Sequence, residues 1–310
     1  MMVTKKLALI LGYECNNNCR FCYCADKKYD KKIAAKTTSE AKREMREGLE
    51  RGCNFVDFLG GEPTIRKDIF ELVRYAKKIG YNTIGMTTNG RMLSYREFAE
   101  KIMQCGLNHL IFSLHGHTAE LHDYLTQSPG SYAQATAGMK NVREIRPDTY
   151  ICTNTVIVRP NYKFLPQIAE NNIKLGANAC EFIFIHPRGN ALKNFEEIVP
   201  KISEIVDYIP DTILAGRSHG IKHFVFRYLP VCYMLGVGYE SYLSEYESKE
   251  RLKEEHVGPE YRDLNVEENR RIHGRVKGKQ CKACKYDRVC EGIFREYAEK
   301  RGFDELVPVP

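Results

Sequence analysis

The sequence has no apolar run that approaches the ~18 residues needed to cross a membrane, and it shows no cleavable signal. Residues 1–12 place two lysines before a short apolar run, but that run continues into Tyr13-Glu14-Cys15 without a small-residue cleavage site. Hydrophobic residues make up 43% of the chain and charged residues 28%, which excludes the disordered and collagen-like classes. We therefore expect a cytoplasmic globular protein with no membrane partner.

Charge of one sign is not concentrated anywhere in the chain. Lys and Arg number 47 and Asp and Glu 40, which leaves a scattered net charge of +7. The clustered basic and aromatic stripe that is typical of nucleic-acid-binding proteins is missing. We therefore expect no nucleic-acid partner, and the mild positive balance gives weak support to an anionic substrate.

Within the 310 residues, the first 190 alternate short apolar or β-branched runs with amphipathic stretches of helical period. This alternation is typical of βα units around a parallel sheet. Six units predict an α/β fold, a partial (βα)6 barrel of the TIM type, with active-site residues at the carboxyl ends of the strands. The predicted strands are 7–11, 55–59, 83–88, 110–115, 151–158 and 181–186, and the predicted helices are 38–50, 68–79, 95–104, 132–145, 164–175 and 199–208.

The pattern changes in the last third of the chain. Residues 221–229 predict a strand, whereas residues 239–279 are rich in charge and show no core-forming period. A cysteine-rich segment follows, and then a predicted helix over 293–300. We therefore divide the chain into a barrel domain, 1–215, and a small C-terminal domain, 216–310, which contains the charged insert.

Twelve cysteines without a secretory signal are poor candidates for disulfides, so their spacing indicates metal or redox chemistry. Cys15, Cys19 and Cys22 form C-x3-C-x2-C directly after the first predicted strand. Three thiolates can hold three corners of a cubane iron–sulfur cluster and leave the fourth iron open to a small molecule. Zinc is the alternative, but it prefers four closed ligands, and Cys24 at C-x-C spacing is a strained fourth.

Further motifs follow in order along the chain. Gly60-Gly61-Glu62-Pro63 ends the second predicted strand, Thr87-Thr88-Asn89-Gly90 the third and Ser113-Leu114-His115-Gly116 the fourth, while Asn154 lies in the fifth. Together with the cysteine motif, this series resembles the radical S-adenosylmethionine (radical SAM) superfamily over about residues 5–190.

The resemblance implies a role for each motif. Cys15, Cys19 and Cys22 would hold a 4Fe–4S cluster whose open iron chelates the amino and carboxylate groups of S-adenosylmethionine (SAM). The second motif would receive the methionine ammonium, a task that suits edge carbonyls and a carboxylate. The implied cofactor-binding residues are Phe21 and Tyr23 around the adenine, Gly60, Gly61, Glu62 and Pro63 at the ammonium, Thr88, Ser113 and Asn154 at the ribose and methionine carboxylate, and Asn89 and His115 beside them.

The same residues also have simpler interpretations. Gly60 and Gly61 fit an ordinary strand-to-helix turn. Phe21 and Tyr23 fit ordinary packing, and His115 fits a satisfied core histidine. The order of the motifs and their places at strand ends carry the resemblance.

A second group, Cys281, Cys284 and Cys290, forms C-x2-C-x5-C, with Cys232 upstream. The spacing alone fits zinc or iron–sulfur. Next to a radical SAM barrel, it resembles the twitch or shortened SPASM module, which implies an auxiliary 4Fe–4S cluster and two clusters in all. Full SPASM modules have seven cysteines, and this one has four. We expect Cys232 to be the fourth ligand; with three ligands, an open iron would instead grip the substrate.

The five other cysteines are interpreted as small buried hydrophobes. Cys152 has a second interpretation, because it shares a strand face with Asn154 and could reach the barrel interior. There it is a candidate hydrogen-atom donor to a substrate radical. The five are Cys24, Cys53, Cys105, Cys152 and Cys180.

The resemblance implies that the reduced cluster cleaves SAM to methionine and a 5′-deoxyadenosyl radical, which abstracts a hydrogen from the substrate. We expect a peptide or protein substrate that is crosslinked, oxidised or epimerised, and a flavodoxin- or ferredoxin-type reductant. The peptide would be recognised by a separate delivery protein or by the insert 239–279. The alternatives are a small-molecule substrate such as a nucleotide or sugar, and a non-catalytic iron–sulfur electron carrier or metal-binding module.

Overall fold

The computed structural model describes residues 4–221, 223–235 and 252–310. Its main sheet has nine strands in the order β7-β6-β5-β4-β3-β2-β1-β8-β9. Every neighbouring pair from β7 to β8 is parallel, and only β9 runs antiparallel to its neighbour. The strands are β1 (Thr4–Ile10), β2 (Phe55–Leu59), β3 (Thr83–Thr88), β4 (His109–Ser113), β5 (Tyr150–Ile157), β6 (Ala179–Phe184), β7 (His223–Arg227), β8 (Leu252–Val257) and β9 (Arg262–Asp263).

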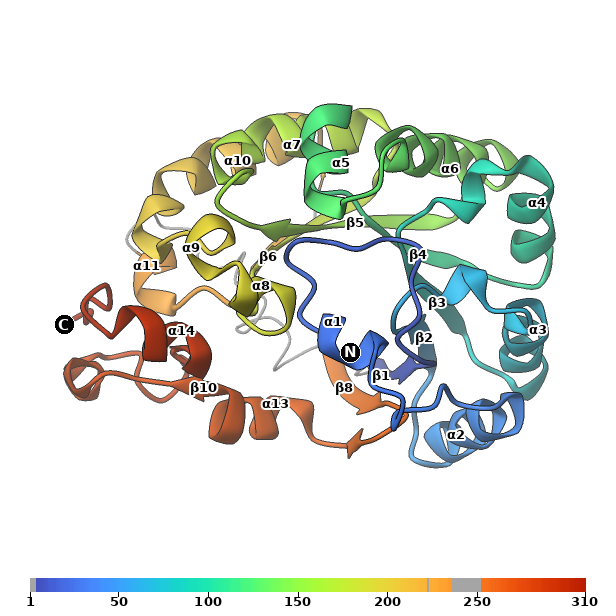
Figure 1. Ribbon diagram of the computed structural model, residues 1–310, viewed down its shortest axis with the longest axis horizontal. Coiled ribbons are helices and arrows are strands. Elements are labelled where there is room, and N and C mark those ends of the chain that lie inside the picture. Colours follow the sequence, from blue (N-terminus) through green and yellow to red (C-terminus); the bar gives the residue numbers. More distant parts are fainter. Residues whose placement is uncertain (1–3, 222, 236–251) are drawn as a thin grey trace.

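The sheet curves around an interior, and the long helices form an arc on its outer side (Figure 1). The first of these begins at a capping box in which Thr37 and Glu40 satisfy each other's backbone N–H groups. Its buried residues Ala41 and Met45 belong to one apolar core with Leu7 of β1. The helices are α1 (Ala25–Lys28), α2 (Thr38–Glu50), α3 (Ile69–Ile79), α4 (Arg96–Gln104), α5 (Ala119–Thr126), α6 (Ser131–Ile145), α7 (Leu165–Lys174), α8 (Asn190–Lys193), α9 (Phe195–Ile198), α10 (Ile209–Ser218), α11 (Val231–Leu235), α13 (Val266–Asn269) and α14 (Arg295–Arg301).

The predicted α/β fold with a mostly parallel, TIM-like sheet is confirmed, but six strands are too few. All six predicted strands are present as β1 to β6, and β7, β8 and β9 extend the same sheet. The predicted helix over 199–208 is wrong, because residues 202–208 form two 3₁₀ turns. The helix, α10, begins at Ile209 with Pro210 in its first turn, where a missing N–H group costs nothing.

The charged insert predicted over 239–279 contains a strand of the main sheet, which corrects our interpretation of it. Residues 236–251 lie outside the described part of the chain, but β8 pairs in parallel with β1. An apolar pattern is missing because positions on both faces of the strand hold ionic groups. Glu254 pairs with Lys6, and Glu255, 1% exposed, pairs with Lys5 at 2.7 Å. Both β7 and β8 come from the segment 216–310, so the sheet extends across the predicted domain boundary.

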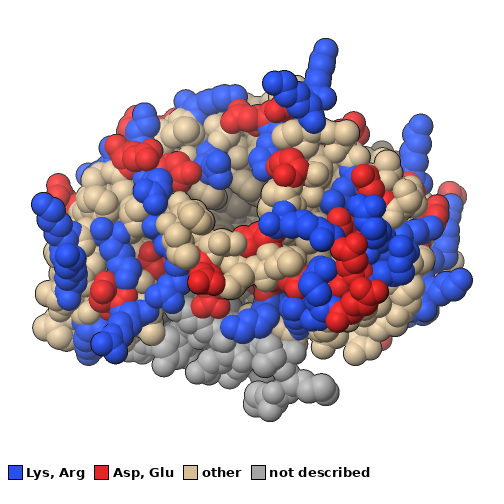
Figure 2. Space-filling model, turned by 90° about the horizontal axis from the view of Figure 1, so that it is seen from below, with Lys and Arg blue, Asp and Glu red and all other residues tan. Residues whose placement is uncertain are grey.

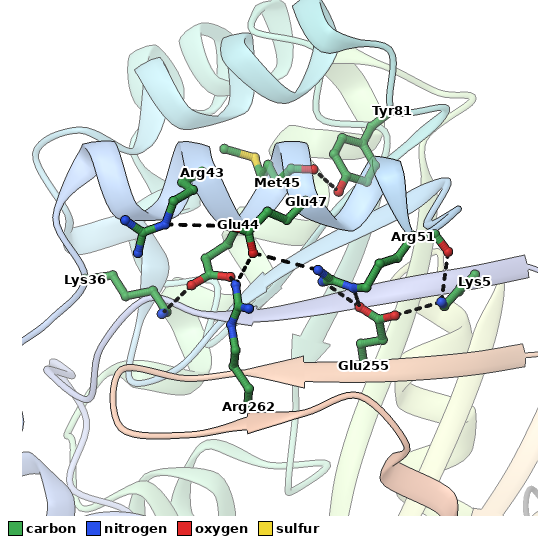
Figure 3. A network of polar contacts seen from close by, with 10 residues as sticks. All are labelled: Lys5, Lys36, Arg43, Glu44, Met45, Glu47, Arg51, Tyr81, Glu255 and Arg262. Atoms are coloured by element: carbon green, nitrogen blue, oxygen red, sulfur yellow. Dashed lines mark hydrogen bonds and ion pairs between the residues drawn. The ribbon is translucent and has the colours of Figure 1, made fainter.

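An ionic network fixes β8 and β9 to the start of the barrel (Figure 3). Arg262 of β9 donates to Glu44 and Glu47 of α2. Arg51, at the end of α2, pairs with Glu255 at 2.7 Å. Since Glu44 and Glu255 are 3% and 1% exposed, removal of a cationic partner would leave a buried carboxylate without compensation. The hairpin of β8 and β9 is therefore an integral part of the barrel.

The cysteine-rich end of the chain folds around a small second sheet of β10 (Arg275–Val276) and β11 (Ile293–Phe294). The predicted helix over 293–300 begins two residues late, at Arg295, because residues 293 and 294 pair with β10. Tyr297 of α14 is 1% exposed, and its ring meets Phe184 of β6 edge-on at 5.6 Å. This contact places the C-terminal segment against the end of β6.

Basic and acidic side chains are interspersed on the face of the molecule that Figure 2 shows. Neither sign forms a continuous field there, in line with the scattered charge of the sequence. Among the described residues, no helix has both the length and the apolar character that a membrane span requires.

Candidate functional site

The first cysteine motif lies in the loop after β1, at the carboxyl ends of the parallel strands. The side chains of Cys15, Cys19 and Cys22 are partly exposed. The backbone N–H of Asn17 donates to Cys15 Sγ at 3.4 Å, and Lys28 Nζ donates to the carbonyl oxygen of Cys15 at 2.9 Å. N–H···S bonds of this kind stabilise thiolate ligands in iron–sulfur sites.

Backbone hydrogen bonds join this loop to the glycine motif at the end of β2. Gly61 N donates to Gly12 O at 2.8 Å, and Glu62 N donates to Glu14 O at 2.7 Å. A Cβ atom on Gly61 would lie 1.9 Å from Glu14 O, and one on Gly60, at φ +143°, would lie 2.3 Å from Gly12 O. Only glycine allows this approach, so the pair has a structural role whether or not it also receives the methionine ammonium.

The Glu62 carboxylate is 3% exposed and serves as an acceptor for the neighbouring loops. Oε1 accepts from Thr64 N at 3.1 Å and from Thr88 Oγ1 at 2.6 Å, and Oε2 accepts from Asn89 N at 2.7 Å. Burial raises the pKa of this carboxyl, while the same hydrogen bonds favour its ionised form. Glu62 therefore joins the ends of β2 and β3, a role that the sequence did not reveal.

Replacing Glu62 by Ala should destabilise the protein by about 3 kcal/mol, because several buried donors lose their acceptor. SAM binding should weaken while iron content is retained, since no thiol ligand is touched. Urea unfolding, iron analysis and calorimetric SAM titration check these effects. Glu97→Ala, at an exposed position of α4, is the matched control. Wild-type SAM affinity in a folded Glu62→Ala protein would remove Glu62 from the binding site.

The polar residues that end β3, β4 and β5 lie at the same edge of the sheet. Asn89 Nδ2 donates to Asn16 Oδ1 at 2.7 Å and so contacts the cysteine loop directly. Ser113 and Asn154 are register partners on β4 and β5. Among the residues that the structure describes, Asn154 Oδ1 is buried and has no hydrogen-bond partner, so it can accept a bond from a ligand. Thr88 is 1% exposed and is engaged by Glu62.

Phe21, a buried residue of the cysteine loop, packs against the buried His115. Phe21 is 7% exposed, and its ring meets the His115 ring edge-on at 4.7 Å. His115 Nδ1 accepts from Val156 N at 3.2 Å, which leaves the proton on Nε2. His115 N in turn donates to His122 Nδ1 at 3.2 Å. Burial lowers the pKa of His115 well below its ordinary value and that of His122 to about 4.

Stability should fall on acidification through the His122 titration. The unfolded state takes up a proton near pH 6.5, whereas the folded state resists protonation until about pH 4. The stabilisation is complete above pH 6.5 and decreases by about 3 kcal/mol as the pH falls to 4. His122→Asn keeps an acceptor near Nδ1 without a titrating ring, so its stability should depend less on pH. Urea unfolding at pH 7 and 4.5 checks this, with exposed His219→Asn as control; equal pH slopes in all three proteins would contradict it.

Tyr23 is placed differently from Phe21. It is 54% exposed, and its ring stacks on His186 at 6.1 Å and 11°. The buried Cys24 thiol lies 3.6 Å from Cys22 Sγ, and their hydrogen bond holds the pKa of Cys22 below its ordinary value. His186 was not among the predicted site residues.

Three residues just after β6 were missed by the sequence reasoning. Asn190 N donates to Cys22 O and Asn190 Nδ2 to Cys19 O, both at 2.9 Å. Gly189 approaches the carbonyl oxygen of Cys22 so closely that a Cβ atom on residue 189 would lie 2.5 Å from this oxygen. His186 and these two residues follow the carboxyl end of a parallel strand, and this position was the signal available in the sequence.

Cys152 lies on β5 and is 3% exposed. Burial raises the pKa of its thiol well above the ordinary value, with Glu181 and Arg227 among the charged groups nearby. It pairs in register with Ile111, two residues before the Ser113 end of β4. Cys152 is therefore set deeper in the barrel than Asn154, and its role as a hydrogen-atom donor stays a prediction.

The four C-terminal cysteines line one small cavity of about 20 Å³, together with Tyr286, Gly292 and residues 306–308. Cys232 reaches it from α11, and Cys281, Cys284 and Cys290 reach it from the loop before β11. Backbone N–H groups point at these thiols: Gly292 N lies 3.3 Å from Cys290 Sγ, and Val309 N lies 3.4 Å from Cys284 Sγ.

The donor sets fit the cofactors that the sequence implies. Three thiols lie in one loop, one of them, Cys15, accepts a backbone N–H bond, and the set suits a cluster with an open iron. Four thiols around one cavity suit a fully ligated cluster. As placed in the described ranges, no three or more His, Cys, Asp or Glu side chains enclose a single metal ion.

Comparison with known proteins identifies the family of this chain. The model of the Radical SAM superfamily matches residues 9–164. A protein of Saccharolobus islandicus named "Probable GTP 3′,8-cyclase" is 30% identical over 223 residues, which are 72% of this chain and 70% of that protein. The PqqA peptide cyclase of Rhodopseudomonas palustris is 33% identical over 210 residues, 68% of this chain and 54% of the cyclase.

A solved structure extends the likeness to the fold. The crystal structure of Streptococcus suis SuiB bound to the precursor peptide SuiA superposes with a TM-score of 0.67 and 17% sequence identity. The alignment covers 99% of this chain and 75% of SuiB, so the barrel and the C-terminal segment both have counterparts in shape. With the cysteine loop, the glycine motif and the matched family model taken together, the chain belongs to the radical SAM superfamily.

Proposed function

We propose that this radical SAM enzyme modifies a peptide or protein, and that it does so with a second, auxiliary 4Fe–4S cluster held by Cys232, Cys281, Cys284 and Cys290. The observation that carries the proposal is the single cavity lined by all four thiols. Four ligands complete the coordination of a cluster, so such a cluster has no iron to offer a substrate. It suits electron transfer to or from a product radical, and oxidative crosslinking of a peptide needs such transfer.

Membership of the superfamily implies one 4Fe–4S cluster and SAM as cofactors. When bound, they supply the 5′-deoxyadenosyl radical that abstracts hydrogen. The chain's own residues bind and orient them: the loop of Cys15, Cys19 and Cys22 holds the cluster, and the neighbouring strand ends form the SAM site. Asn154 Oδ1 offers an acceptor to the cofactor, and the buried ring of Phe21 anchors the cysteine loop.

The N–H groups directed at the second group of thiols further support an auxiliary cluster. Gly292 and Val309 donate to Cys290 and Cys284. A backbone bond from Val307 favours the ionised form of Cys232, although burial raises the pKa of this thiol to about 11. Hydrogen bonds to cysteine sulfur tune the potentials of iron–sulfur clusters.

A small-molecule substrate is the second candidate. The observation that favours it is the relationship to proteins named as GTP 3′,8-cyclases, which extends over 72% of this chain. For such a substrate, an auxiliary cluster with three ligands and an open iron would serve as the clamp. The relationship to a peptide cyclase and the four-thiol cavity favour the peptide. The reductant and a peptide-delivery protein stay predictions.

The experiment is anaerobic incubation of the reconstituted enzyme with dithionite and SAM, followed by mass spectrometry. One arm contains GTP, and the other contains short peptides encoded beside the gene. The expected result is 5′-deoxyadenosine in both arms and a mass change of the peptide only. A modified nucleotide would replace the proposal by its alternative. If no 5′-deoxyadenosine forms under strong reduction, the enzymatic function itself is wrong.

A further inference from the structure

The loop after β6 and the short helix α8 that follows it, residues 185–194, lie between the first cysteine loop and the C-terminal segment. On one side, three amide donors of this loop meet carbonyl oxygens of the cysteine loop. Asn190 uses its N and Nδ2 for Cys22 O and Cys19 O at 2.9 Å, and Asn194 Nδ2 donates to Arg20 O at 3.2 Å. These bonds satisfy the carbonyls between the second and third cysteines, so the loop after β6 helps to fix the motif's conformation.

On its other side, the same loop contacts the C-terminal segment through a column of rings. His186 stacks on Phe294 of β11 at 4.1 Å and 9°, and on Tyr23 at 6.1 Å and 11°. Tyr23 directly follows the ligand Cys22 in sequence. The Arg275 guanidinium covers the far face of the column, 3.8 Å from the Phe294 ring centre. The column therefore connects the third cysteine of the first group to the module that carries the second group.

Charged side chains lie next to the His186 ring. Glu296 of α14 lies with Oε2 3.6 Å from His186 Nε2, and Arg188 Nε lies 3.4 Å from Glu296 Oε1. Burial lowers the pKa of His186. The Glu296 carboxylate raises this pKa, whereas the charges of Arg188 and Arg275 lower it further. A neutral imidazole stacks between aromatic rings without the cost of a buried charge.

We infer that His186 is a positioning residue for the first cluster and its SAM site, and that it makes the C-terminal segment part of that site through Phe294. The inference rests on the cofactors of the superfamily and not on the proposed peptide substrate. His186 acts through Tyr23 and the backbone around Cys22, and it is not itself a ligand. Removal of the His186 ring leaves Tyr23, the residue after Cys22, without its stacking partner. Asn190 still donates to the carbonyl oxygen of Cys22.

The test compares His186→Ala with His186→Phe in the reconstituted full-length protein. The Ala variant should bind SAM about three- to tenfold more weakly, since a stacked ring pair has that worth. The EPR spectrum of the reduced first cluster should also change on SAM addition in a way that differs from wild type. The Phe variant keeps the stack and should restore both properties. Exposed His219→Ala is the control.

A second pair of variants approaches the column from the C-terminal side. Phe294→Ala should reproduce the SAM and EPR effects of His186→Ala, Phe294→Tyr should not, and the double Ala variant should be no worse than either single one. Thermal unfolding identifies any variant that fails to fold. Wild-type SAM affinity and spectrum in folded His186→Ala, or failure of His186→Phe to restore them, would overturn the inference. Since 5′-deoxyadenosine formation in wild type is scored separately, such a result leaves the enzymatic function intact.

Discussion

Replacement of Cys15, Cys19 and Cys22 together by Ala is expected to reduce 5′-deoxyadenosine formation to background. The reconstituted protein should then hold about four iron atoms rather than about eight, since one of two 4Fe–4S clusters is lost. The effect is large because the cofactor supplies the difficult chemistry and the thiols are its covalent attachment. Iron and sulfide analysis, together with product quantification by mass spectrometry, measures it.

The matched control removes three cysteines from the apolar core. Cys53, Cys105 and Cys180 are 1%, 4% and 0% exposed, and all belong to the main core cluster. Their triple Ala variant should keep about eight iron atoms and lose only modest stability, as small buried side chains do. If the Cys15, Cys19 and Cys22 variant loses all its iron, the two groups of cysteines do not form separate clusters.

The barrel could be predicted because each element of its first 190 residues has a strong local pattern. The strand β2 is a short, mainly apolar run, β3 combines Ile and Met with β-branched threonines, and α2 begins at a capping box. Their motifs also fall at carboxyl ends of parallel strands, where active sites gather. The placement of Asn89, Ser113 and Asn154 at one edge of the sheet follows from that rule.

The strand β8 could not be predicted, because its stability depends on partners far away in sequence. Glu255 is buried only because Lys5 and Arg51 neutralise it, and these residues come some two hundred positions earlier. No local sequence pattern predicts such a long-range ion pair. For the same reason Glu260, in the turn after β8, could not be linked to the cysteine loop, although it accepts from Tyr13 Oη at 2.9 Å.

The sequence reasoning also missed residues that hold the cysteine loop in place without belonging to it. Asn190 contributes through two hydrogen bonds to backbone carbonyls, which carry no side-chain signature. His186 belongs to a column whose other members, Tyr23 and Phe294, are more than one hundred positions away on either side. Sequence motifs report the groups that contact a cofactor, whereas the groups that hold those residues in place become visible only in the fold.

Replacement of Cys232 by Ala is the second change with a large expected effect, and it discriminates between the candidate mechanisms. In the background without Cys15, Cys19 and Cys22, the remaining iron and its spectrum belong to the auxiliary site alone. We expect Cys232→Ala to alter that spectrum or to reduce the iron below about four atoms, because one of four ligands is lost. Anaerobic absorption and EPR spectroscopy, with and without substrate, measure the change.

The structure supports full ligation, because Cys232 lines the same cavity as the other three thiols. Its helix, α11, begins just after Pro230, and Leu229 and Met234 on either side are 3% and 0% exposed, so the thiol is held by packed neighbours. Cys180→Ala in the same background is the control for the loss of a thiol outside the cavity. A spectrum that Cys232→Ala leaves unaltered, together with a shift on addition of substrate, would contradict full ligation. The auxiliary iron would then bind the substrate directly, and the mechanism would change from electron transfer to a substrate clamp of the kind that a small molecule requires.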